Sequence, residues 1–153
     1  MSCPYFDPVA PRFAGSGPET AMLPLGDAWT GICRATPDQP WQPDHATLGP
    51  LCNLGYARGT CARFPQGDGP DAVRFAVSSD VSSDISSDQD ATIHLYYVIE
   101  RDHHPFAHGP LEHTSAGVQG AGPLLARQAQ AYARSYLRRK RAGRGPERNI
   151  DAR

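Results

Sequence analysis

Residues 92–100 read Thr-Ile-His-Leu-Tyr-Tyr-Val-Ile-Glu, and this alternation of side chains decides the fold class. Every second residue is apolar and falls on one face of a strand. These residues are Ile93, Leu95, Tyr97 and Ile99. The same pattern begins at Asp71, and residues 106–112 predict a third strand after a turn at 102–105. The simplest arrangement of three such strands is an antiparallel meander.

A helix is predicted after the meander, over residues 123–141. Pro123 suits the first helical turn, and apolar residues recur behind it at helical spacing. The sequence therefore predicts an α+β fold with about three strands, in which the C-terminal α-helix covers one face of the β-sheet. Residues 71–142 would hold the meander and the helix. Residues 143–153 would form a disordered basic tail.

Residues 77–88 repeat one tetrapeptide three times, Val-Ser-Ser-Asp twice and then Ile-Ser-Ser-Asp. Asp at every fourth position lacks the glycine and the carbonyl geometry of a calcium loop. We therefore interpret the repeat as an expanded, solvated and mobile hairpin loop between the first two strands.

The N-terminal lobe, residues 1–70, contains most of the 15 prolines of the chain. Proline fixes φ and removes a backbone donor, so we expect a loop-rich, irregular lobe. Hydrophobic residues make up only 39% of the chain. Neither half then has enough apolar residues to stand alone, and residues 1–142 are expected to form one domain. A bound metal would stabilise such a domain.

All four cysteines lie in this lobe, and we predict that they form one metal-binding site. They are Cys3, Cys33, Cys52 and Cys61. Free cysteines that merely fill a core would be scattered along the chain. Structural zinc sites usually use closely spaced pairs such as Cys-x2-Cys, and no such pair occurs here. The wide spacing favours an iron–sulfur cluster, with 4Fe–4S preferred. Zinc and a metal-free set of thiols or a disulfide remain alternatives.

The segment between Cys52 and Cys61 fits a cluster as well. Two glycines in residues 53–59 allow close backbone approach, so that N–H groups could bond the sulfides. Arg58 is expected to offset the negative charge of the cluster. This distributed four-cysteine arrangement resembles the cluster-binding lobes of some DNA-processing enzymes, such as certain helicases, nucleases and the primase large subunit. The resemblance covers ligand count and wide spacing, and no catalytic motif.

A second feature is the histidine-rich turn at residues 101–109. His103, His104 and His108, with Asp102, have the chemistry of a transition-metal site or an acid–base set. Adjacent histidines at a hairpin turn point in different directions, however, and Asp, His and Pro are ordinary turn residues. We interpret the turn as structural. A site of three cysteines and one histidine stays open.

Three functions follow from these features. The first is a non-catalytic iron–sulfur protein whose cluster transfers electrons, senses redox state or rigidifies the lobe for a protein partner. The second is a zinc-stabilised module that binds nucleic acid or a protein through a basic helix end. That end consists of Arg138, Arg139, Lys140 and Arg141. The third is a metal-dependent enzyme that uses the histidine turn.

The expected cellular location is based on two sequence features that do not occur in the chain. It shows no secretory signal and no apolar run long enough to cross a bilayer, so neither export nor a membrane partner is expected. We expect a cytoplasmic protein, in which thiols are kept reduced.

Overall fold

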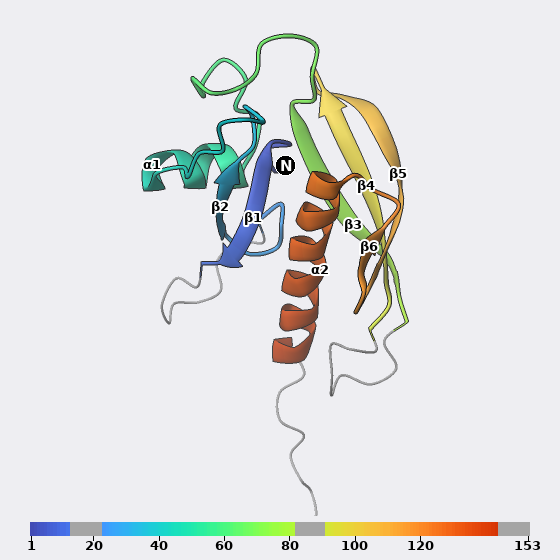
Figure 1. The fold of residues 1–153 in the computed structure, drawn as a ribbon. Helices are drawn as coiled ribbons and strands as arrows, with labels where there is room; N and C mark the ends of the chain where they lie inside the picture. The colour runs from blue at the N-terminus through green and yellow to red at the C-terminus, as the bar shows by residue number, and fades with distance from the viewer. Residues whose placement is uncertain (13–22, 82–90, 144–153) are drawn as a thin grey trace, which may run out of the picture.

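The long C-terminal helix α2 (Pro123–Gly143) lies between two antiparallel sheets (Figure 1). The structure, a computed structural model, describes residues 1–12, 23–81 and 91–143. The helix was predicted from Pro123, and its observed end at Gly143 lies two residues beyond the predicted one. The part of the predicted tail from residue 144 onward lies outside the described residues.

The larger sheet is the predicted meander with one strand added. It consists of β3 (Ala72–Asp80), β4 (Ile93–Arg101), β5 (His104–Thr114) and β6 (Gly117–Gln119), in that spatial order. The α+β class is confirmed, but the expectation of about three strands is wrong. Strand β6 has three residues, too few for an alternating pattern to appear.

The alternation in β4 places its apolar residues toward the helix. Ile93 and Leu95 are fully buried, whereas Tyr96 on the opposite face is 39% exposed. Leu95 lies opposite Val77 of β3 and Leu111 of β5 in the register of the sheet. These cross-strand neighbours share one face, so that face can pack against α2.

The smaller sheet corrects the expectation of an irregular lobe. It is a two-stranded pair of β1 (Phe6–Pro11) and β2 (Trp29–Cys33), with a bulge between Pro8 and Ala10. Prolines are tolerated there because β1 has a strand on one side only, so their missing N–H groups need no ladder partner. A short helix α1 (His45–Thr47) and a π-helix η1 (Leu48–Asn53) complete the lobe.

The tetrapeptide repeat lies partly in regular structure. Its first copy belongs to β3, which runs to Asp80, so that copy is not in a loop as predicted. Residues 82–88 of the repeat lie outside the described residues. Asp80 accepts a hydrogen bond from the Tyr136 hydroxyl at 2.9 Å and pairs with Lys140, which fixes the end of β3 against α2.

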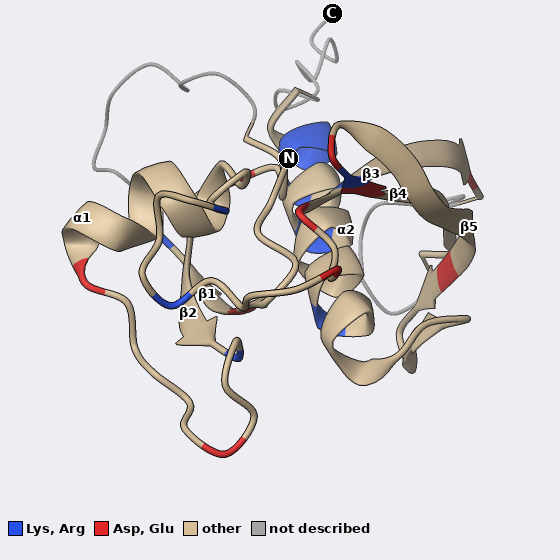
Figure 2. Cartoon of the chain, turned by 90° about the horizontal axis from the view of Figure 1, so that it is seen from above, with Lys and Arg blue, Asp and Glu red and all other residues tan. Residues whose placement is uncertain are grey.

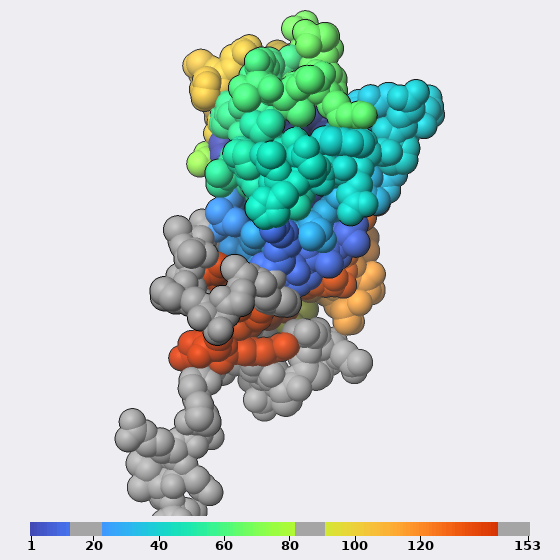
Figure 3. Space-filling model, turned by 90° about the vertical axis from the view of Figure 1, so that its left-hand side faces the viewer, coloured from blue at the N-terminus to red at the C-terminus, as the bar shows by residue number. Residues whose placement is uncertain are grey.

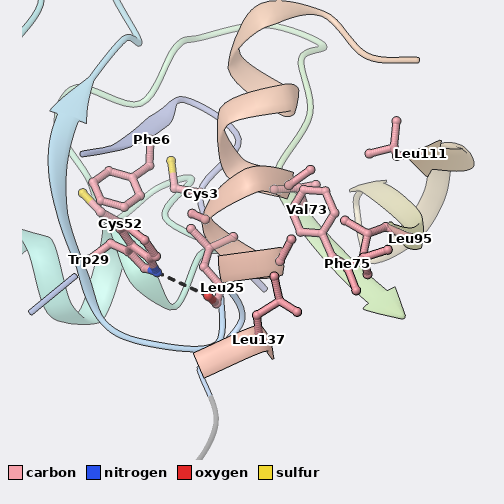
Figure 4. Close-up of a cluster of buried hydrophobic side chains, with 14 of the residues drawn as sticks. Cys3, Phe6, Leu25, Trp29, Cys52, Val73, Phe75, Leu95, Leu111 and Leu137 are labelled. Carbon is pink, nitrogen blue, oxygen red and sulfur yellow. Dashed lines mark hydrogen bonds between the residues drawn. The ribbon is translucent and has the colours of Figure 1, made fainter. Parts of the chain in front are cut away.

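One apolar core joins the lobe, the helix and the larger sheet (Figure 4). Cys3, Cys52 and Trp29 lie on one side of α2, whereas Phe75 and Leu95 lie on the other. All are buried. That the lobe and the sheet unfold together stays a prediction. Within the described ranges, no helix is long and apolar enough to cross a membrane.

The basic end of α2 is held by acidic residues of the same chain (Figure 2). Arg138 donates to Asp27 from Nε at 3.0 Å and from its terminal nitrogen, and Arg139 also reaches Asp27. Burial alone would raise the pKa of Asp27, but hydrogen bonds from Arg138 and Ser135 outweigh it and the pKa is lowered. The helix end thus docks on the turn before β2.

A buried glutamine on α2 connects the helix to the N-terminal segment. Gln128 is 1% exposed, and its Nε2 donates to the carbonyl oxygens of Cys3 at 2.9 Å and Phe6 at 2.6 Å. Leucine has a similar shape but cannot donate. Gln128→Leu is therefore expected to lower the free energy of unfolding by about 1–3 kcal/mol.

The measurement is urea unfolding followed by circular dichroism. Gln130→Leu on the same helix is the matched control, because Gln130 is only half-buried, and it should cost less than about 0.5 kcal/mol. Equal losses in the two variants would contradict the bridging role of Gln128.

Candidate functional site

The four cysteines line one pocket in the N-terminal lobe. They come from four separate places: the residues before β1 (Cys3), the end of β2 (Cys33), η1 (Cys52) and a turn further on (Cys61). All four are free thiols. The cavity between them has a volume of only about 20 Å³, and the space rises to about 300 Å³ only when the adjoining open solvent is included. Figure 3 faces this side of the molecule, where the residues after β2 lie next to the blue N-terminal strand.

The rest of the pocket wall is largely apolar and aromatic. The other lining residues are Tyr5, Ala35, Trp41, Thr47, Leu51, Ala57, Arg63 and Phe64. Tyr5 and Phe64 meet edge to face, with ring centroids 5.3 Å apart. Cys3 and Cys52 are buried, whereas Cys33 and Cys61 are half-buried. The pocket therefore has a closed inner side and a more exposed outer side.

Backbone hydrogen bonds fix the cysteine segments relative to one another. The Cys3 N–H donates to the Cys52 carbonyl at 3.0 Å, and Phe6 lies opposite Cys33 in the β1–β2 register. The Cys61 N–H donates to the Ala57 carbonyl at 2.8 Å, which closes a tight turn. Residues distant in the sequence are thus brought together by main-chain bonds, which do not depend on the cysteine side chains.

Asn53 braces the segment that carries Cys52. Its buried side chain accepts a hydrogen bond from the Trp29 N–H at 2.9 Å and donates to the Trp29 and Leu48 carbonyls at 3.0 and 2.9 Å. The Asn53 side chain therefore connects the backbone of β2 to η1 through hydrogen bonds. A π-helix leaves backbone groups out of the ordinary helical pattern, and π-helical turns often occur at functional sites.

Burial keeps the inner thiols protonated. It raises the pKa of Cys3 to about 12, although the backbone N–H groups of Tyr5 and Phe6 act in the opposite direction. Burial also raises the pKa of Cys52 to about 12, and the neighbouring cysteines add to this shift. At neutral pH both groups are neutral thiols, so a metal that binds them as thiolates must release protons.

The four cysteines line a common pocket, but their side chains are not arranged as a single-ion site in the described residues. Among residues 1–12, 23–81 and 91–143, no three His, Cys, Asp or Glu side chains lie close enough to hold a single metal ion. A tetrahedral zinc ion at 2.3 Å from each sulfur would need sulfurs only about 3.8 Å apart.

The histidine turn lies outside the pocket, whose wall within the described residues contains no histidine. His103 stacks on Tyr56 with ring centroids 4.3 Å apart, and the His104 ring pairs with the Asp102 carbonyl at 2.6 Å. His108 pairs with the Tyr96 hydroxyl. The three histidines therefore contact three different groups. The His103–Tyr56 contact also joins this turn to the segment between Cys52 and Cys61.

Arg58 has a different role from the predicted one. It pairs with Asp71, donates to the Gly67 carbonyl at 2.8 Å and lies over the Phe64 ring, and it does not line the pocket. Its charge is largely offset by Asp71. The cation that lines the pocket is Arg63, which sequence reasoning missed. The only signal for it was its position two residues after Cys61.

Comparison of the chain with protein-family models, with curated proteins and with solved structures finds no match.

The two-sided pocket predicts a reactivity order for the metal-free protein. With iodoacetamide at pH 8, Cys33 and Cys61 should be alkylated first, because they are half-buried. Cys3 and Cys52 should react at least about tenfold more slowly, because they are buried and their pKa of about 12 keeps the reactive thiolate scarce.

Peptide mass spectrometry over a time course measures the order, and the same reaction in urea is the control in which all four cysteines should react alike. Uniform labelling without urea would show that the metal-free lobe does not hold its cysteines in this pocket.

Proposed function

We propose that this chain is a non-catalytic iron–sulfur protein that binds one 4Fe–4S cluster through Cys3, Cys33, Cys52 and Cys61. The observation that carries the proposal is the pocket itself: four free cysteines, distant in the sequence, line one largely apolar space. Four thiolates are the complete ligand set of a cuboidal cluster.

The arrangement of the cysteines favours a cluster over a single ion. In a cuboidal cluster each thiolate binds a different iron, so the sulfur atoms stand around the group and need not converge. The four cysteines come from four separate segments and line one common space, which suits that requirement. A structural zinc would require closer approach of all four. Zinc in a binding module is the alternative, and the same assay separates the two.

The surroundings supply what a cluster needs. The backbone N–H groups of Tyr5 and Phe6 act to lower the pKa of Cys3 against the effect of burial, and hydrogen bonding of this kind stabilises thiolate charge. Arg63 places a cation at the wall of the pocket, where it would offset the negative charge of the four thiolates. Apolar side chains around the rest of the wall limit access of water.

The exposure of the ligands favours a redox role over a purely structural one. A purely structural cluster is best buried on all sides, whereas electron transfer or redox sensing needs one accessible edge. Cys33 and Cys61 are half-buried, so they supply such an edge, while Cys3 and Cys52 anchor the inner side. A protein partner that exchanges electrons would approach from the side of Cys33 and Cys61.

The test is the metal content and visible spectrum of protein purified without oxygen. We expect broad absorption near about 400 nm that bleaches with dithionite, and about four iron and four sulfide per chain. Colourless protein with one zinc per chain would replace the cluster with the zinc-stabilised module.

Single Cys→Ala variants at the four positions are expected to lose most of the colour. Ser78→Ala is a control outside the pocket, because the Ser78 hydroxyl donates to the His94 carbonyl on the sheet. A Cys variant that retains full iron and sulfide would remove that cysteine from the ligand set. Protein with neither iron nor zinc would overturn the proposal.

A further inference from the structure

Two side chains of the pocket wall, the half-buried Trp41 and the exposed Arg63, stack on each other. The guanidinium carbon of Arg63 lies 4.5 Å from the centre of the Trp41 ring, within the range of a cation–π interaction. Both residues line the pocket. Sequence reasoning singled out neither residue as part of a pair, because they are 22 positions apart and meet only in the folded lobe.

Each member of the pair is tied to one of the half-buried cysteines. Trp41 and Cys33 exchange two backbone hydrogen bonds, at 2.7 Å and 3.1 Å. Arg63 follows Cys61 by two residues, and the Phe64 N–H donates to the Cys61 carbonyl at 3.1 Å. The stack therefore links the two segments that carry the exposed cysteines.

We infer that Trp41 and Arg63 are positioning residues that form a cover over the outer side of the cluster. The inference rests on the proposed function and adds a means by which the lobe limits access to its exposed edge. When the stack is closed, it holds the Cys33 and Cys61 segments together. When it opens, small molecules reach the iron from that side.

The rate at which a chelator removes iron from the loaded protein tests this cover. The probe is 2,2′-bipyridine under nitrogen, with the loss of absorbance near about 400 nm followed over time. This chelator is uncharged, so removal of an arginine does not change its electrostatic attraction to the protein. Arg63→Gln and Trp41→Leu should each accelerate iron loss about two- to fivefold, as expected for loss of a stack at an exposed site.

Three further variants make the result specific. Arg63→Lys keeps the charge and part of the stack, so it should fall between wild type and Arg63→Gln. The double variant Trp41→Leu/Arg63→Gln should lose iron no faster than the faster single variant, since both changes remove the same interaction. Arg74→Gln removes an arginine from outside the pocket, 56% exposed and 4.0 Å from Glu100, and should leave the rate unchanged.

Two kinds of failure are distinguishable. Suppose that the protein binds its cluster but Arg63→Gln and Trp41→Leu lose iron at the wild-type rate, or that their effects multiply in the double variant. Either result would contradict the cover and leave the proposed cluster in place. Acceleration in Arg74→Gln would also overturn the cover, because it would point to a general charge effect. If neither the wild type nor any variant holds iron and sulfide, both the proposed cover and the proposed function are wrong.

Discussion

The N-terminal segment of residues 2–6 is hydrogen-bonded to β3, to β2, to η1 and to α2. Ser2 exchanges hydrogen bonds of 2.8 and 2.9 Å with Val73 on the outer edge of β3. Cys3 donates to Cys52 through its backbone and accepts from Gln128 on α2. One extended stretch thus joins the sheet, the helix and the cysteine pocket. A shift of this segment would displace Cys3 from the other three cysteines, so the geometry of the pocket depends on how well it is held.

The sequence predicts some elements well because local physics decides them. Alternation in β4 defines a strand whatever its neighbours are, and helical spacing after Pro123 defines α2. The β1–β2 pair escaped prediction because Pro8 and Pro11 argue against strands. Only the tertiary structure shows that β1 has a free edge on which these prolines are tolerated.

The candidate site also has features that the sequence predicts and features that it does not. The sequence indicated that the four cysteines belong together, since they are confined to one proline-rich lobe, and the fold brings them to one pocket. It could not distinguish the two arginines near them. Arg58 and Arg63 are equivalent in type and five positions apart, but Asp71 lies beside Arg58 and Trp41 lies beside Arg63. Contacts of this kind depend on the packing of loops, which no local pattern encodes.

Two of the cysteines lie on backbone that hydrogen bonds hold in place, and this limits how the pocket can adapt to an occupant. Cys52 lies on η1, which Asn53 fixes to β2, and Cys33 ends that same strand. Convergence of all four sulfurs on one ion would have to come from side-chain rotation or from movement of these braced segments. The second route breaks buried hydrogen bonds, each costly to leave unmade. Rotation of the cysteine side chains breaks none of these bonds. The braced backbone therefore fixes where Cys33 and Cys52 leave the main chain, and side-chain rotation is the less costly way for the pocket to adapt to an occupant.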